Sequence, residues 1–224
     1  MTSEFKIVAD WLSGTGVSNE FRSTKNRQEF EEGDLDTIVL HYTAGGEART
    51  SASFLASDHT KVSAHLIIGR DGGIFQLIPF NMKAWHAGKS EHQGRVGMNR
   101  YSLGITMDNA GILEQIDQYY RSWFGGRYTA DKVVYEKHHN HNHLSYWHKY
   151  TDVQISTCET VCKLLVDHYN LKFILGHDEV APERKTDPGP AFPIAAIRQR
   201  IFGKEKNPIP APIARSKARL KSVS

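Results

Sequence analysis

Residues 176–190 read GHDEVAPERKTDPGP, and this polar stretch decides how the rest of the chain is interpreted. It follows Phe173–Leu175, a short apolar segment that is typical of a strand. His177 and Asp187 lie ten positions apart, with Pro182 between them. That spacing is too long for one helical turn, but it suits two ligands folded back onto one metal ion. Neutral imidazole and carboxylate are groups that Zn²⁺ accepts, and a catalytic zinc takes three such ligands plus water.

His41 is the candidate for the third ligand. It ends the continuous apolar run Thr37–Leu40, which predicts a buried strand. A side chain at the end of a central strand is held at the edge of the sheet where sites collect. A single histidine in such a place is more often a hydrogen-bonded structural residue. The density of Asp, Lys and Pro in residues 176–190 is what favours the functional interpretation of His41 and His177.

Four segments, in this order along the chain, resemble the zinc-dependent N-acetylmuramoyl-L-alanine amidases. That family includes cytosolic anhydro-muropeptide amidases, phage lysozyme-type amidases and peptidoglycan recognition proteins. The segments are Val39–Thr43, Val62–Ile67, Ala84–Gly88 and Gly176–Pro190. The resemblance extends over roughly residues 35–202. It implies a Zn²⁺ enzyme that hydrolyses the amide bond between N-acetylmuramic acid and L-alanine in peptidoglycan or muropeptides.

The resemblance also implies roles for individual residues. His41, His177 and Asp187 match the zinc ligands of the family, and Lys185 matches the lysine that stabilises the developing oxyanion. Trp85 and His86 resemble a pair that lines the substrate cleft. An aromatic ring beside a hydrogen-bond donor suits a sugar or a peptide stem, although Trp85 could also simply anchor its loop.

The chain departs from the family at the group that moves the proton. Cytosolic members carry a glutamate on a strand resembling Ser102–Thr106, and here Thr106 stands in its place. Lysozyme-type members use a tyrosine just before the histidine of the second segment, where this chain has Ala64. Asp108 shares the strand face of Thr106 if the strand continues, but it would be displaced by roughly 6–7 Å. Asp108 is equally well explained as a turn residue.

Two classes of function therefore remain open. Intact metal and lysine positions favour an active amidase, whereas Thr106 and Ala64 favour a weak or inactive protein that binds peptidoglycan without cutting it. A nucleic-acid binder is supported only by the basic C-terminal residues. The net charge of +3 does not call for such a partner, and a mildly basic surface is compatible with anionic peptidoglycan.

Composition places the chain among ordinary soluble proteins, and we expect a monomer. Cys158 and Cys162 lie four residues apart in a helical pattern, which favours small buried residues over a zinc pair. Met1–Lys6 lacks a basic segment followed by an apolar run, and no stretch is apolar enough to cross a membrane. We therefore expect a cytoplasmic protein, which would meet cell wall as internalised fragments or after release by phage lysis or a secretion machine.

The pattern of elements predicts one α/β domain with a central mixed sheet flanked by helices. We expect strands near residues 37–41, 62–68, 74–78, 101–107 and 173–175, a hairpin turn at Arg70–Gly73, and helices over 48–57, 151–169 and 194–202. Thr151 and Gln154 form the expected capping box, and Cys158, Val161, Leu165 and His168 the expected inner face of the middle helix.

The remaining segments are less regular. Residues 1–35 are expected to form an irregular arm packed on the domain at 36–203, and residues 204–224 a basic, proline-containing, disordered tail. Residues 112–150 form an insertion rich in aromatic residues and histidine, with a tract from His138 to His143 followed by His148. This tract is interpreted as a solvated or cleft-lining loop rather than a metal store.

Overall fold

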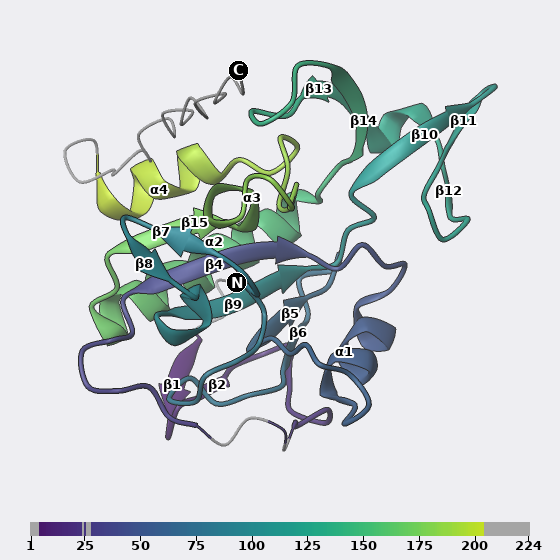
Figure 1. The fold of residues 1–224 in the computed structure, drawn as a ribbon. Helices are drawn as coiled ribbons and strands as arrows, with labels where there is room; N and C mark the ends of the chain where they lie inside the picture. Colours follow the sequence, from purple (N-terminus) through teal and green to yellow (C-terminus); the bar gives the residue numbers. More distant parts are fainter. Residues whose placement is uncertain (1–4, 24, 26–27, 204–224) are drawn as a thin grey trace, which may run out of the picture.

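The computed structural model describes residues 5–23, 25 and 28–203, and the predicted tail at 204–224 lies outside that part of the chain. A six-stranded mixed sheet runs through the middle of the molecule (Figure 1). In spatial order its strands are β15 (Phe173–Gly176), β4 (Thr37–Tyr42), β9 (Ser102–Met107), β5 (Leu66–Ile68), β6 (Ile74–Gln76) and β3 (Val17–Ser18). The predicted α/β class and mixed sheet are confirmed.

The first four strands of this sheet are parallel, and β5 turns back into the antiparallel β6. The turn falls at Arg70–Gly73, as predicted. Gly72 has φ of 83°, and Asp71 Oδ1 accepts a hydrogen bond from the Gly73 amide at 3.0 Å. A left-handed backbone at Gly72 costs little because glycine has no Cβ.

One face of the sheet is covered by α2 (Asp152–Tyr169), which buries Cys158, Val161, Cys162 and Leu165 against Ile38 and Leu40. The Thr151 hydroxyl accepts from the Gln154 amide at 3.1 Å, which confirms the predicted N-cap. The capping box is incomplete, because the Gln154 side chain donates to the carbonyls of Ile68 and Asp108 instead. His168 is exposed, contrary to expectation, since it lies at the edge of the apolar stripe.

The opposite face of the sheet holds two smaller clusters and the metal-ligating candidates. On β4, Ile38 and Leu40 face α2, so Val39 and His41 face away from it. The covering elements are α1 (Ala48–Ala56), η1 (Met98–Arg100), α3 (His177–Val180) and the β7 (Glu91–His92) to β8 (Arg95–Val96) hairpin. At the edge of the sheet, α4 (Ile194–Phe202) joins the main core through Ile197, with the bounds predicted for it.

The N-terminal residues are more regular than expected. β1 (Lys6–Val8) pairs with β2 (Trp11–Ser13), and β3 forms the last strand of the main sheet. Leu12 is fully buried in the main core. These strands are two or three residues long, which is too short for a periodic pattern to reveal.

Most of the predicted insertion at residues 112–150 is regular structure, although its His138–His143 tract is a loop between two strands. The insertion forms a separate five-stranded sheet, ordered β12 (Arg127–Tyr128), β11 (Tyr119–Arg121), β10 (Ile112–Ile116), β14 (Leu144–His148) and β13 (Val133–Lys137), with η2 (Ala130–Lys132) before β13. Contacts between tyrosine rings stabilise it, with Tyr135 stacked on Tyr146 and Tyr120 tilted against Tyr146. This inserted sheet projects beyond the end of the main sheet, on the same side of the molecule as α1 (Figure 1). Among the described residues, no helix is long and apolar enough to cross a membrane.

Candidate metal centre and active-site cleft

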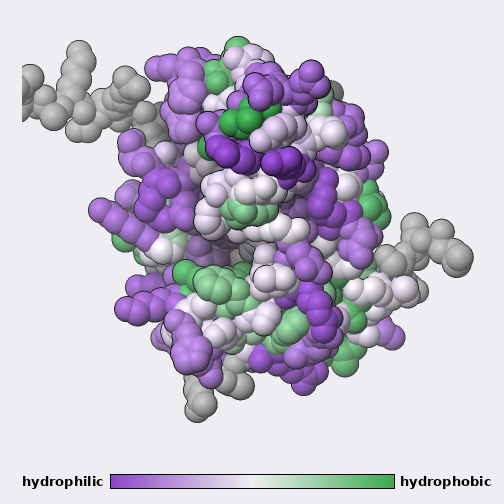
Figure 2. Space-filling view, turned by 90° about the vertical axis from the view of Figure 1, so that its right-hand side faces the viewer, coloured by the Kyte–Doolittle hydropathy of each residue, from purple (hydrophilic) through white to green (hydrophobic). Residues whose placement is uncertain are grey.

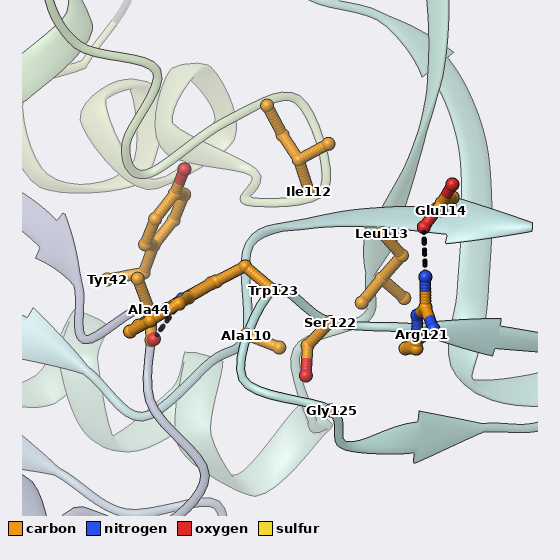
Figure 3. Close-up of a pocket in the computed structure, with 10 residues that line it drawn as sticks. All are labelled: Tyr42, Ala44, Ala110, Ile112, Leu113, Glu114, Arg121, Ser122, Trp123 and Gly125. Carbon is orange, nitrogen blue, oxygen red and sulfur yellow. Dashed lines mark hydrogen bonds and ion pairs between the residues drawn. The ribbon is translucent and has the colours of Figure 1, made fainter.

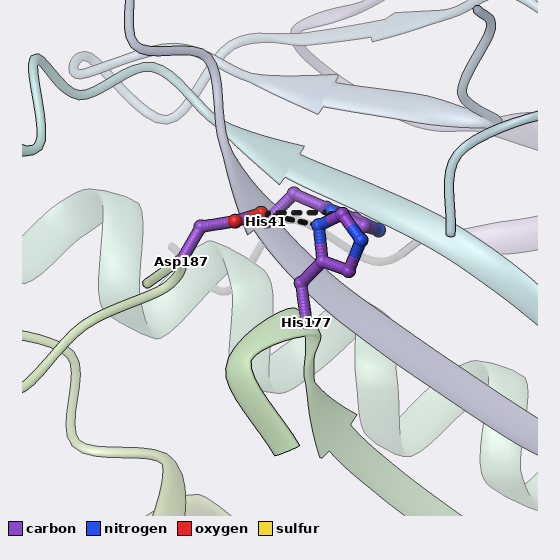
Figure 4. A group of neighbouring side chains, drawn as sticks. All are labelled: His41, His177 and Asp187. Carbon is purple, nitrogen blue, oxygen red and sulfur yellow. Dashed lines mark hydrogen bonds and ion pairs between the residues drawn. The ribbon is translucent and has the colours of Figure 1, made fainter. Parts of the chain in front are cut away.

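Three side chains meet where β4 and β15 end. His41 is on β4, His177 begins α3 directly after β15, and Asp187 comes from the loop that follows (Figure 4). Because β4 and β15 are parallel neighbours, with Leu40 opposite Gly176, their carboxyl ends bring the two histidines together. His41 Nδ1, His177 Nδ1 and Asp187 Oδ2 are each 2.9 Å from the other two. All three residues are buried.

Hydrogen bonds fix the position of the proton on the Nε2 atoms of His177 and His41. His177 bonds directly to a backbone carbonyl, and His41 is linked to one through His86. His177 Nε2 lies 3.1 Å from the carbonyl of Ala87, so it must carry the proton. His86 Nε2 likewise donates to the carbonyl of Ser102 at 3.2 Å, which leaves its Nδ1 as an acceptor. That Nδ1 is 2.9 Å from His41 Nε2, so His41 donates there.

The inner atoms are therefore all acceptors. With the protons on the Nε2 atoms, His41 Nδ1 and His177 Nδ1 present lone pairs to each other and to the Asp187 carboxylate. Three buried acceptors in mutual contact repel one another unless a cation lies among them. A second hydrogen bond that fixes the tautomer is the usual support for a metal-ligating histidine. The donor set thus fits a divalent metal, and the group is one of two such clusters among the described residues.

The electrostatics of the three residues agree with this. Burial, reinforced by the neighbouring His177, lowers the pKa of His41 to about 4, so its imidazole is neutral at neutral pH. Neutral imidazole and ionised carboxylate are the states that bind metal.

Gly104 makes room for the histidine that supports His41. A Cβ at Gly104 would lie 2.5 Å from Cγ of His86, closer than real Cβ contacts come. The ring of His86 therefore lies flat against the backbone of β9, where it reaches both Ser102 and His41. Any larger residue at position 104 would displace His86.

An open cleft of about 650 Å³ leads to the three ligand candidates. Figure 2 views the face that carries α1 and the inserted sheet, and a recess with hydrophobic residues at its edges crosses that face. The lining includes Ala64, Thr106 and Lys185 together with His41, His177 and Asp187. Thr106 pairs directly with His41 in the register of β4 and β9. Its neighbours Leu103 and Ile105 lie in the core, so the predicted orientation of Thr106 toward the cleft is confirmed.

A family model described as N-acetylmuramoyl-L-alanine amidase matches residues 31–190. The chain belongs to this amidase family.

A curated relative is the 1,6-anhydro-N-acetylmuramyl-L-alanine amidase AmpD of Escherichia coli, which is 36% identical over 142 residues. The match covers 62% of this chain and 58% of the relative, so the chain spans little more than half the length of that protein. The amidase AmiD of E. coli is 27% identical over 178 residues, with 75% of this chain and 54% of AmiD covered.

Solved structures of the same family share the fold. A selenomethionine derivative of AmpD superposes with a TM-score of 0.61 at 26% identity, over 88% of this chain and 99% of AmpD. The E. coli AmiD complex with anhydro-N-acetylmuramic acid-L-Ala-D-γ-Glu-L-Lys gives a TM-score of 0.57 at 22% identity, covering 88% of this chain and 65% of AmiD. The family's fold is thus shown for this chain.

Lys185 lies in the cleft beside the ligand candidates. Its backbone amide donates to the carbonyl of Ala181 at 3.0 Å, which closes the turn after α3. Its ammonium group is near enough to His41 to contribute to the lowered pKa of that imidazole. The side chain is only partly buried, so it can meet a substrate in the cleft.

The carboxylate of Asp108, a predicted proton-transfer candidate, is engaged by neighbouring groups of the protein. β9 ends at Met107, so the strand does not carry Asp108 along the face of Thr106. Its carboxylate instead accepts from the Thr43 hydroxyl at 3.3 Å and interacts with the Ala48 amide at the start of α1. Burial raises its pKa, partly offset by these bonds and by Arg70. Asp108 is not among the described residues that line the cleft.

The segment Ala84–Gly88 supports the ligand candidates rather than simply lining the cleft. Trp85 is 45% exposed and is not among the described cleft residues. His86 does line the cleft, but His41 and Ser102 occupy both of its ring nitrogens. The Ala87 carbonyl accepts from His177 and also from Arg184 at 2.8 Å. Sequence reasoning missed this role because a backbone acceptor leaves no side-chain signal.

The second cluster of possible metal ligands lies between the inserted sheet and α3. His138 Nε2 is 2.9 Å, and His139 Nε2 3.9 Å, from Asp178 Oδ2. The Asn140 amide donates to His138 Nδ1 at 3.1 Å, so the proton of His138 lies on Nε2 and points at Asp178. His138 is therefore a hydrogen-bond donor here, with no lone pair for a metal. His138 is buried, so the tract is not a solvated loop throughout.

Two further cleft residues were not anticipated from the sequence. Glu47, just before α1, and Trp123, at the tip of the β11–β12 hairpin, both line the cleft. Neither residue belongs to a recognisable sequence motif. Each lies in a segment that connects two elements, and only the path of that segment in the folded chain brings it to the cleft.

Proposed function

We propose that this chain is a zinc-dependent N-acetylmuramoyl-L-alanine amidase, which hydrolyses the amide bond between N-acetylmuramic acid and L-alanine in peptidoglycan or muropeptides. The observation that carries the proposal is a set of three acceptors in mutual contact, His41 Nδ1, His177 Nδ1 and Asp187 Oδ2. Hydrogen bonds at the Nε2 atoms fix the tautomers of the two histidines. Membership of the amidase family and the name of the AmpD relative support the same chemistry.

Zinc is the metal that suits this ligand set. Two imidazole nitrogens and one carboxylate oxygen match the ligands of catalytic zinc sites with one open position. Magnesium and calcium prefer sites made only of oxygen atoms. Because the three residues line the open cleft, a metal ion held by them would be accessible to water and to the substrate.

The protein's own groups hold the metal and stabilise the charge that develops during amide hydrolysis. When bound, zinc lowers the pKa of a water molecule to about 7 and polarises a carbonyl group. His86 and the Ala87 carbonyl keep His41 and His177 in the ligating tautomers. Lys185 offers its ammonium group from the cleft side, where the carbonyl oxygen of the substrate becomes negative. Donors placed at such an oxygen typically contribute about 10²–10³ in rate.

The proton that must reach the leaving amine has no strong carrier at the expected position. The hydroxyl of Thr106 can orient a water molecule but cannot act as a base near neutral pH. His86 is unsuited, because both ring nitrogens are engaged and burial lowers its pKa well below the usual value. The enzyme should therefore hydrolyse its substrate more slowly than relatives that carry a glutamate there.

A second candidate function is peptidoglycan binding without hydrolysis. The observation that favours it is Thr106 itself, which faces the cleft directly beside His41 and supplies no carboxylate. The complete ligand set and Lys185 favour hydrolysis, because a pure binding protein gains little from them.

Two measurements distinguish these functions. One is the zinc content of the protein, and the other is the release of peptides with N-terminal L-alanine from purified peptidoglycan and from muramoyl peptides. We expect one zinc per chain and peptide release that His177→Ala abolishes. Zinc with substrate binding but no peptide release would identify the binding protein. Absence of zinc, or zinc retained in His177→Ala, would show that the proposed metal centre is wrong.

A further inference from the structure

Trp123 is both highly exposed and firmly held. Its side chain is 78% exposed at the tip of the β11–β12 hairpin, yet the indole N–H donates to the carbonyl of Ala44 at 2.8 Å (Figure 3). The tip is closed by two 2.9 Å hydrogen bonds between Ser122 and Gly126. Phe124 packs edge-on against the indole and covers Gly46. Since the polar atom of Trp123 is satisfied, the face of the ring is what it offers to a ligand.

Trp123 lies between two hollows that together form one longer groove. It lines the cleft of the metal centre, and it also lines a second hollow of about 580 Å³. Tyr42 and Ala44, just beyond His41 on the chain, line both as well. A substrate whose amide bond lies at the metal centre can therefore continue past Trp123 into the second hollow.

The second hollow suits an uncharged group. Its wall is apolar at Ala110, Ile112 and Leu113, and its charged residues, Glu114 and Arg121, pair with each other at 2.8 Å. A stem peptide carries carboxylates, which would need an unpaired cation. A neutral pyranose ring instead presents a face of C–H groups, which packs on an aromatic ring, and a rim of hydroxyls, which can bond to the exposed Glu114 and Arg121.

We propose that Trp123 is the stacking platform for the neutral amino sugar adjoining the muramoyl residue, so that the chain acts preferentially on substrates that retain this neighbouring sugar. The inference rests on the proposed function, because it takes the amide at the metal centre as its reference point. It adds a sugar subsite built by the inserted sheet, with Trp123 binding the glycan and taking no part in bond cleavage.

The test compares two substrates with the same peptide, one a muramoyl peptide and the other the disaccharide peptide. For the zinc-loaded wild-type protein we expect a kcat/KM about three- to tenfold higher on the disaccharide, the size of one aromatic contact. Trp123→Ala should remove this advantage by raising KM more for the disaccharide peptide than for the muramoyl peptide, whose muramoyl end also reaches the shared cleft. Trp123→Phe should retain most of it. Leu144→Ala, which removes an exposed apolar side chain elsewhere on the inserted sheet, should behave as wild type.

A binding measurement keeps the subsite separate from the activity. The indole N–H signal of Trp123, identified by its loss in Trp123→Phe, should shift on titration with the disaccharide peptide but not with the free stem peptide. This shift, even if the protein hydrolyses neither substrate, would support the subsite while the proposed function fails. Equal loss on both substrates in Trp123→Ala, or no shift with the disaccharide, would overturn the sugar platform.

Discussion

The side chain of Lys185 approaches the metal centre without being one of its ligand candidates. We expect Lys185→Ala to retain zinc and to lower kcat by about 10²–10³, since an oxyanion-stabilising donor is lost. Lys89→Ala, which removes an exposed lysine outside the described cleft lining, is the matched control. Zinc content by metal analysis and kcat on a muramoyl peptide are the measurements. Unchanged turnover in Lys185→Ala would rule out its role.

Thr106 is the position at which one substitution should strengthen the enzyme. It faces the cleft opposite His41, so Thr106→Glu places a carboxylate beside the metal centre. General acid–base catalysis is typically worth about 10²–10⁴-fold, and kcat should rise toward that range. Thr106→Gln introduces a side chain of the same size as glutamate but without its charge, so it should not raise kcat. A neutral or harmful effect of Thr106→Glu would mean that another group, such as Glu47, already moves the proton.

His86 is hydrogen-bonded to the ligand candidate His41 and is not itself a ligand candidate. We expect His86→Ala to weaken zinc affinity by about 10- to 100-fold, the usual effect of losing a residue that orients a metal-ligating histidine. Trp85→Ala, at the neighbouring position, should leave zinc affinity unchanged. Competition with a coloured chelator measures both. If His86→Ala binds zinc as tightly as wild type, the tautomer of His41 is not controlled by His86.

At the scale of elements, a buried hydrogen bond joins the inserted sheet to α3. His138 Nε2 donates to the Asp178 carboxylate at 2.9 Å, next to His177 in the chain. His138→Ala leaves that buried carboxylate without its donor, which should lower the free energy of unfolding by about 1.5–3 kcal/mol. His143→Ala removes an exposed histidine of the same tract and should cost little. Urea unfolding followed by circular dichroism tests the difference.

The elements also show where sequence reasoning works. α2 and α4 were predictable because their apolar residues recur at helical period and a Thr cap or a Gly marks an end. The inserted sheet was not, because its strands are short and exposed on one side, so polar residues and histidine obscure the alternation. The ligand candidates were found because they lie in motifs. The carbonyls of Ala87 and Ser102 that orient them have no side-chain signature.

The whole molecule should lose stability in mild acid, because several histidines are buried in the neutral form. His148 shows the sign. Burial, with Arg70 and Lys132 nearby and Tyr128 against its ring, lowers its pKa from 6.5 to about 3. Below pH about 6.5, His148 is therefore protonated in the unfolded chain but stays neutral in the folded chain. The free energy of unfolding consequently falls as the pH drops from 6.5 toward 3.

His148→Gln tests this dependence. Glutamine stays neutral and can still accept a hydrogen bond from the Ala110 amide, as His148 Nδ1 does at 3.2 Å. Denaturant unfolding at pH 7 and pH 4.5 should show a smaller loss of stability in the variant than in wild type. The same loss in both proteins would assign the acid sensitivity to other buried histidines, such as His65.

The distance along the chain between the ligand candidates has a consequence for biosynthesis. Asp187 lies 146 positions after His41, and the strands that hold the two histidines are direct neighbours in the sheet. A ribosome must release nearly all of the amidase domain before the last ligand can reach the first. A metal ion at the proposed centre therefore cannot guide the early steps of folding, and it would have to reach a domain that is already essentially complete.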